Sequence, residues 1–304
     1  MFRYYILIAT LLSFSSQAVE IQIRSGAGQG DLHWAIGTSD RSISTLSTLK
    51  WKRLEYVSYG GEGLLRFWSS GLVLLGGDYG SIFSGINEDS DFSKNGREGL
   101  YSFSKAKSNK GEIFDLYGAF GIESCNFGLY FQIFAGWAHA EQHVRQMSPA
   151  SFYYNGNNDP FDPVNVIITG QIQNLHSNYR ALWHGPWIGF RVLPDFGRFH
   201  LKLGFEYHRL CYHGTGNWNL REDLARKFKH YGSGNGFKVL AEGAFDLTPS
   251  SKIGLRFDAS YYHLNGGVDR VSYYDNQAIL TAEVPLNEVT WNTGSIKLFY
   301  ERVF

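Results

Sequence analysis

The chain has 304 residues with 28 basic and 28 acidic side chains, so its formal net charge at neutral pH is zero. This balance argues against a nucleic-acid partner, because domains that bind nucleic acid usually carry a basic surplus. Two cysteines are too few for a fold held together by disulfides, and 16% aromatic residues with 35 glycines favour an all-β protein.

The N-terminus has the features of a secretory signal peptide. One basic residue, Arg3, precedes an apolar run over residues 4–14, and the small residues Ser16 and Ala18 fit the two positions that determine cleavage. The apolar run is too short for a membrane-spanning helix. We therefore predict that residues 1–18 are a signal peptide and that residues 19–304 form a single domain of an exported protein.

Several long segments alternate between apolar and polar residues. In residues 199–207 the odd positions are apolar or aromatic and the even positions are polar or glycine, and residues 237–247 and 253–261 show a similar period of two. Such alternation indicates strands with one apolar and one polar face. The strands of soluble sandwiches are shorter, about five or six residues. After an export signal, long alternating strands predict an antiparallel up-and-down transmembrane β-barrel in the bacterial outer membrane.

Turn-forming residues divide the chain into alternating short and long connections. In an outer-membrane barrel the short connections face the periplasm and the long ones face outward. Four short turns and five long loops make nine connections, which gives ten strands with both termini in the periplasm; eight and twelve strands are the alternatives. The turns are expected at residues 68–71, 123–126, 194–197 and 248–251, and the loops at 38–45, 86–107, 148–174, 214–236 and 266–280.

An acidic stretch in the second long loop is the first candidate site. Asp89 and Asp91 are two positions apart, which puts both side chains on one face of an extended backbone. Two carboxylates held close together cannot both ionise freely, so the pKa of one rises and the pair can hold and transfer a proton. The alternative is a polar loop whose acids are simply solvated.

The fourth long loop has a helical pattern. Asn219 followed by Glu222 resembles a helix N-cap with its capping box. Apolar residues then repeat every four positions, at Leu220, Leu224 and Phe228. A short basic helix above the barrel mouth would either pack the loop down or bind an anionic partner such as a lipopolysaccharide phosphate.

Metal and disulfide sites receive little support. Residues 91–96 match the start of a calcium-binding loop, but Ser102 stands where that loop needs a glutamate, so calcium is a weak alternative. The histidines lack a firm spacing for a metal on strands, and we expect no metal and no cofactor. Cys125 and Cys211 are expected near opposite ends of the barrel, too far apart for a disulfide.

The order of these features resembles the omptin family of outer-membrane endopeptidases. The stretches similar to that family's strands and turns are residues 49–52, 186–190, 199–201 and 247–253. The resemblance covers most of the mature chain and implies a ten-stranded barrel that needs lipopolysaccharide and acts on peptides or proteins. It also implies that Asp89 and Asp91 form one of two catalytic pairs that activate a water molecule.

The second omptin pair, an Asp-x-His, falls on Asn217 and Asn219 in this sequence. Neither amide can take a proton from water near neutral pH, so the histidine that serves that family as general base is not retained at its own position. The side chains near enough to substitute for it are His213, Glu222, Asp223 and His230.

Three functions follow as hypotheses. The first is a surface endopeptidase of aspartic type that uses Asp89 and Asp91, and the second is a catalytically inactive surface adhesin or binding protein. The third is a narrow pore, which is disfavoured because inward-facing charges of both signs would pair inside the lumen. The expected partners are outer-membrane lipid, lipopolysaccharide and a peptide or protein at the extracellular loops, and the chain is expected to be a monomer.

Overall fold

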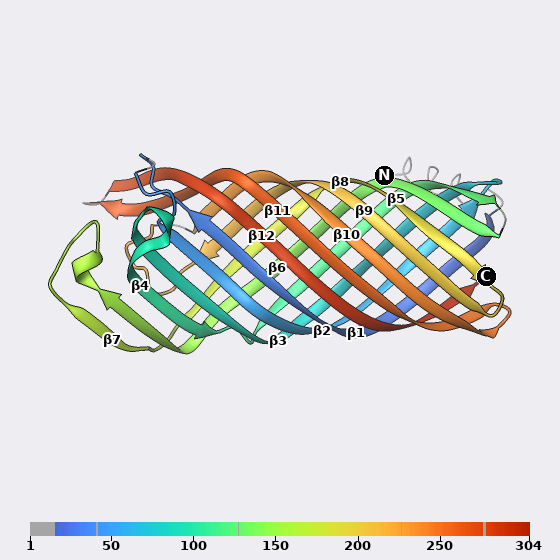
Figure 1. Cartoon of the computed structure of the whole chain (residues 1–304), viewed down its shortest axis with the longest axis horizontal. Helices are drawn as coiled ribbons and strands as arrows, with labels where there is room; N and C mark the ends of the chain where they lie inside the picture. Colours follow the sequence, from blue (N-terminus) through green and yellow to red (C-terminus); the bar gives the residue numbers. More distant parts are fainter. Residues whose placement is uncertain (1–15, 41, 127, 226, 276–277) are drawn as a thin grey trace, which may run out of the picture.

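In the computed structural model, the chain forms long tilted strands that close into a ring. The structure describes residues 16–40, 42–126, 128–225, 227–275 and 278–304. Every pairing between strands is antiparallel in these residues, and the last strand pairs with the first (Figure 1). Most of the predicted signal peptide, residues 1–15, lies outside the described residues. Within them, no helix is long and apolar enough to cross a membrane.

Twelve strand segments and two short 3-10 helices make up the described secondary structure. The strands are β1 (Ser16–Ile36), β2 (Ser47–Phe67), β3 (Gly71–Lys94), β4 (Glu98–Lys107), β5 (Gly111–Asn126), β6 (Leu129–Asn155), β7 (Ile167–Ile172), β8 (His176–Phe196), β9 (Phe199–Asn217), β10 (Phe228–Thr248), β11 (Ser251–Asp275) and β12 (Ala278–Val303). The 3-10 helices are η1 (Asn95–Arg97) and η2 (Gly156–Asn158). The protein is all-β, as the alternation predicted.

The twelve segments occupy ten positions around the ring. β4 and β5 both pair with β3 on one side and with β6 on the other, so they lie end to end in one position. β7 and β8 both pair with β6 and share the next position. The ring closes where β1 pairs with β12, beginning at Glu20↔Val303. The ten-stranded barrel predicted from the sequence is confirmed in this arrangement of the described residues.

The short turns lie close to their predicted places. Those at residues 68–70 and 249–250 agree with the prediction. The other two predicted turns are largely strand, because β5 continues to Asn126 and β8 continues to Phe196. Both strands end a few residues later than the turn-forming residues suggested.

Two segments predicted as long loops are almost entirely strand in their described residues. Residues 86–107 form the outer ends of β3 and β4 with η1 between them, and residues 266–280 belong largely to β11 and β12. The prediction was wrong here because polar residues were read as a sign of loop structure. Strands that rise above the lipid can be polar on both faces while their backbone groups stay paired.

No helix forms in the described part of residues 218–227, where a basic helix was predicted. The chain passes through turns, and Phe228 already begins β10. The Asn219 side chain does not cap a helix. Its Oδ1 accepts hydrogen bonds from the His176 amide at 2.8 Å and from the Ser177 hydroxyl at 3.0 Å, both on β8. These bonds fix the loop to the barrel wall.

The outward-facing side chains form an apolar belt with charged pairs beyond one end. In the second half of β12, outward-facing Ile296 and Leu298 are 61% and 56% exposed. Nearer the end that carries β4 and β7, the Glu88 carboxylate on β3 lies 2.5 Å from the Lys52 ammonium and 3.8 Å from the Lys105 ammonium. Exposed charges of this kind are costly in contact with lipid tails. The part of β3 from Glu88 onward therefore lies above the membrane.

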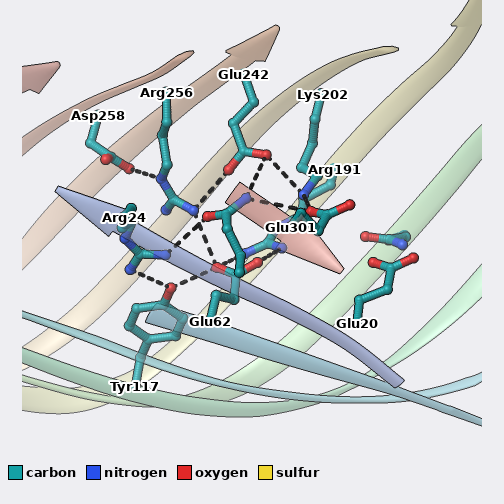
Figure 2. A network of polar contacts seen from close by, with 12 residues as sticks. Glu20, Arg24, Glu62, Tyr117, Arg191, Lys202, Glu242, Arg256, Asp258 and Glu301 are labelled. Carbon is teal, nitrogen blue, oxygen red and sulfur yellow. Dashed lines mark hydrogen bonds and ion pairs between the residues drawn. The ribbon is translucent and has the colours of Figure 1, made fainter. Parts of the chain in front are cut away.

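Charged side chains of both signs fill the middle of the lumen (Figure 2). The Glu62 carboxylate on β2 accepts hydrogen bonds from Arg191 on β8 at 2.6 and 3.0 Å and from Arg256 on β11 at 3.3 Å. The Tyr117 hydroxyl on β5 donates a further bond to Glu62 at 2.6 Å. Arg256 also donates to Glu242 on β10 at 2.9 Å. These strands lie on different sides of the ring, so the ion pairs bridge the interior.

A layer of aromatic rings lies between this network and the outer end of the barrel. Trp51 on β2 stacks on Tyr179 on β8 with 5.3 Å between ring centroids, and Tyr179 stacks on Phe228 on β10 at 6.0 Å. Trp183 on β8 packs against Tyr212 on β9 at 4.4 Å. All five side chains are buried. Rings of this size bury large apolar areas, so the layer is a strong contributor to the stability of the barrel interior.

Breaking the central ion cluster should destabilise the barrel. We expect Glu62→Gln to lower the free energy of unfolding by about 3–5 kcal/mol, because Arg191 and Arg256 would stay buried without their shared carboxylate. Urea titration in detergent micelles, followed by tryptophan fluorescence, measures the change. The control is Glu283→Gln, which breaks an exposed ion pair with Arg270 and should cost about 1 kcal/mol or less. Equal effects of the two variants would contradict the role given to Glu62.

Candidate functional site

A cleft of about 800 Å³ opens at the outer end of the barrel, above the aromatic layer. Trp34 and Phe228, which belong to that layer, form its floor. The outer ends of β3 and β4 line one part of the wall, and the loop between β9 and β10 contributes Trp218 and Arg221. Most of the lining is apolar, so a few polar side chains determine its chemistry.

Asp89 and Asp91 on β3 both line this cleft. Their spacing of two places them on one face of the extended strand, as the sequence predicted. Asp89 pairs in register with Ser104 on β4, and Asp91 pairs with Ser102 on β4 and with Ser47 on β2. Serine hydroxyls from the two neighbouring strands therefore flank the acid pair.

Paired β-bulges on β2 and β3 turn the acids inward. The β2 bulge falls between Lys52 and Glu55, and the β3 bulge falls opposite Glu55 and Tyr56, so the two strands keep the same register above and below. Arg53 in the first bulge has a φ of 51°, and its amide donates to Asp31 Oδ1 at 2.6 Å. One extra residue in a strand moves every later side chain to the opposite face.

Burial raises the pKa of both carboxyls. For Asp89 the charge of Asp91 adds to the effect of burial, and the pKa lies well above the ordinary value of 3.8. For Asp91 burial outweighs hydrogen bonding from Ser47 and Ser102, and the pKa is also raised. Asp89 Oδ1 is buried without a hydrogen-bond partner among the described residues. The pair therefore keeps a proton to higher pH than isolated aspartates do, and can both donate and accept hydrogen bonds.

Arg221 lines the same cleft and is the cation that acts on both aspartates. Its positive charge favours the ionised carboxylates, and so offsets part of the increase in pKa that burial causes. The guanidinium also donates to both oxygens of Asp223, at 2.7 and 2.6 Å. Arginine stays protonated in proteins and cannot serve as a general base. The cleft thus combines an acid pair with an arginine that is itself paired with Asp223.

A family model matches nearly all of the described chain. The model is described as Pom, Protochlamydia outer membrane protein, and it matches residues 22–304. The chain belongs to this family. Among solved structures, the outer membrane protease OmpT from Escherichia coli has a TM-score of 0.79 at 14% identity, covering 96% of this chain and 98% of that chain. The resemblance to omptins is confirmed for the fold.

Other outer-membrane barrels match more weakly. The translocator domain of autotransporter NalP from Neisseria meningitidis has a TM-score of 0.38 at 6% identity, covering 99% of this chain and 93% of that chain. The toluene transporter TodX from P. putida has a TM-score of 0.31 at 10% identity, covering 96% and 92%. No curated protein matches the sequence. The Pom match and the OmpT-like fold locate the protein in the outer membrane, as predicted.

The other sequence candidates in this Pom-family chain lie outside the cleft or at its rim. His213 has an exposed side chain on the outward face of β9. Glu222 and Asp223 are exposed in the β9–β10 loop, and Asp223 is paired with the cleft arginine. Asn217 ends β9, and Asn219 fixes the loop to β8. The positions of the second omptin pair thus have a structural role in this chain.

An Asp–His pair lies beneath the cleft on β10 and β11. His230 Nε2 is 3.3 Å from Asp269 Oδ1, and His230 Nδ1 is 2.7 Å from the Tyr179 hydroxyl. Asp269 lines the cleft, whereas His230 is fully buried, with its ring 5.1 Å from that of Trp34. The inward position of Asp269 is not apparent from the sequence, because the side-chain alternation of β11 changes face near Gly266, which has a φ of 84°.

The possible metal-binding residues and the two cysteines were also located in the structure. Within the described residues, no group of three or more His, Cys, Asp or Glu side chains is placed to hold a metal ion. Residues 91–102, the weak calcium motif, form the hairpin of β3, η1 and β4. Cys125 and Cys211 are both free and exposed.

The raised pKa of Asp89 predicts a pH-dependent stability difference. A carboxyl with a higher pKa in the folded state stabilises the fold below its unfolded pKa, near 3.8, and loses that contribution as the pH rises through the folded pKa. We therefore expect Asp89→Asn to unfold at higher urea concentration than the wild type at pH 7 and to match it at pH 3. Each unit of pKa elevation corresponds to about 1.4 kcal/mol.

Asp40→Asn is the control of opposite sign. Hydrogen bonds from Thr38 and Ser42 lower the pKa of Asp40 to about 2, so its contribution is present above pH 3.8 and is lost as the pH falls. This variant should therefore be less stable than the wild type at pH 7. Parallel pH profiles for Asp89→Asn and the wild type would show that the Asp89 carboxyl is not perturbed.

Proposed function

We propose that the protein is a cell-surface binding protein whose mouth cleft takes a short segment of a polypeptide. The observation that carries the proposal is the partly buried acid pair, Asp89 and Asp91, in a cleft with mainly apolar walls. A pair that shares a proton can donate a hydrogen bond to a peptide carbonyl and accept one from a peptide N–H. The aromatic walls would bury apolar side chains of the same ligand.

The charges of the cleft favour a ligand segment that is neutral or weakly basic. Arg221 lies in the cleft with Asp89 and Asp91, but its charge is already paired with the Asp223 carboxylate. Asp269 adds a carboxylate, with His230 beside it at 3.3 Å. A volume near 800 Å³ is enough for several side chains of an extended peptide.

An endopeptidase is the second candidate, and the closeness of Asp89 and Asp91, with the pKa of both carboxyls raised, favours it. Two aspartates that share a proton activate water in aspartic-type enzymes without a histidine. The omptin route has less support, because Asn219 is engaged in hydrogen bonds to β8 and Arg221 cannot accept a proton. A narrow pore has the least support, since the ion pairs around Glu62 and the aromatic layer both cross the lumen.

For the outer face of the barrel we propose outer-membrane lipid and lipopolysaccharide as partners. Arg180 on β8 is 51% exposed and donates to Glu141 on β6 at 2.5 and 2.6 Å, and His139 lies beside that carboxylate at 3.7 Å. An exposed guanidinium can form paired hydrogen bonds with a lipid phosphate. Within the described residues the ring is closed throughout the apolar belt, which supports a monomer.

Binding and cleavage can be measured on the same samples. The protein is reconstituted in vesicles that contain lipopolysaccharide and incubated with a library of random eight-residue peptides. Mass spectrometry then identifies both retained and cut peptides. We expect retention without cutting, and about tenfold weaker retention by Trp218→Ala, because a buried aromatic anchor contributes more than about 1 kcal/mol. Trp68→Ala, in a turn at the opposite end, should bind as the wild type does.

The variant Asp89→Asn separates the two candidates. If the wild type cuts peptides and Asp89→Asn does not, the protein is an endopeptidase and the binding proposal is wrong. Retention that is unchanged in both Trp218→Ala and Asp89→Asn would show that peptides bind elsewhere. The absence of any retained or cut peptide would refute both candidates for the cleft.

A further inference from the structure

The short strand β7, beside the cleft, has one unpaired edge. β7 pairs with β6 from Ala150↔Ile172 to Asn155↔Ile167, and no other described strand pairs with it. β8 follows β7 in the same position of the ring but pairs with both β6 and β9. Among the described strands, β7 alone lacks a second neighbour.

The hydrogen-bond pattern identifies the backbone groups on that edge. The Gly156 amide donates to the Val166 carbonyl at 2.9 Å, which makes Asn155↔Ile167 a pair without mutual hydrogen bonds. Such pairs alternate along an antiparallel ladder. Ile167, Thr169 and Gln171 therefore direct their N–H and C=O groups away from β6, toward the unpaired edge.

The edge lacks the features that usually protect strand edges. Natural edge strands are blocked by lysine, proline, bulges or a covering segment. Residues 164–175 contain no charged side chain and no proline. The side chains of Ile167 and Ile168 are 62% and 44% exposed. The edge is thus uncharged and open, with two exposed isoleucines.

The arm that carries β7 is braced by its own hydrogen bonds. The Asn155 side chain accepts a bond from the Asn157 amide at 3.2 Å at the start of η2. Asp159 accepts bonds from the Tyr154 hydroxyl at 2.8 Å and from the Phe161 amide at 2.9 Å. Figure 1 shows this arm projecting beyond the outer end of the ring. A strand that is ordered before binding loses less conformational entropy on binding.

We propose that β7 binds an extended segment of another protein by β-strand addition. The open groups of Ile167, Thr169 and Gln171 specify this occupant, because an extended backbone presents donors and acceptors at the matching spacing. The exposed isoleucines favour a segment with apolar or uncharged side chains. Ile172 at the end of β7 lines the mouth cleft, so the bound segment would run along the rim of the cleft. The proposal holds whether or not the acid pair binds a ligand.

A peptide with the sequence of residues 149–156 is the probe, because β6 already pairs with β7 through this stretch. The peptide is fluorescently labelled and titrated with the full chain in lipopolysaccharide vesicles, with anisotropy as the readout. Thr169→Pro removes an open N–H without removing a bond to β6 and should weaken binding about tenfold or more. Thr169→Val keeps that N–H and should bind within about twofold of the wild type.

Two further variants make the test specific. Thr169→Lys keeps the backbone N–H but places a charge on the edge, so it should also weaken binding. This variant replaces Thr169→Pro in the test if the proline disturbs the arm. Trp68→Ala, in a turn at the opposite end of the barrel, should bind the peptide as the wild type does. Failure of the wild type to bind, or equal binding by Thr169→Pro and Thr169→Val, would overturn the proposal. So would a dimer of the full chain in analytical ultracentrifugation that is lost in Thr169→Pro, because a second copy would then fill the edge.

Discussion

The closure of a hydrogen-bonded ring inside a bilayer is the constraint on which the rest of the structure depends. Lipid tails offer no hydrogen bonds, so every backbone group in the apolar belt needs a partner within the sheet. The pairing of β1 with β12 supplies the last of these partners. A ring of ten positions also encloses a narrow lumen, and along each strand the side chains that face this lumen alternate with those that face lipid. The inward residues must therefore satisfy one another.

Filling the lumen is what creates a cleft at its outer end. The ion pairs around Glu62 and the aromatic layer around Tyr179 leave open space above them, where the strands continue beyond the lipid. Asp89 and Asp91 are held on a strand over this floor. Strands hold side chains more rigidly than mobile loops do, and the floor keeps bulk water away from one side of the pair. The raised pKa of the two acids is thus a consequence of the packing beneath them.

The sequence predicted the features that depend on local spacing. A period of two identifies strands directly, so the barrel, its ten positions and the shared face of Asp89 and Asp91 were all accessible. Features that depend on the register between strands could not be predicted from the sequence. The pairing of His230 with Asp269 follows from the β10–β11 register and from a change of face near Gly266. Polar strands above the lipid were read as loops, because composition does not distinguish them.

The paired bulges of β2 and β3 divide each strand into two sections with independent side-chain alternation. Below them, the outward face is constrained by lipid and the inward face by the ion pairs. Above them, both faces are free of those constraints. Loss of the extra residue from β3 would turn Glu88 inward and Asp89 and Asp91 outward without altering any side chain in the lipid-facing section. Barrels of one lineage can therefore exchange one mouth for another by insertions and deletions at the bulges, while the membrane section stays the same.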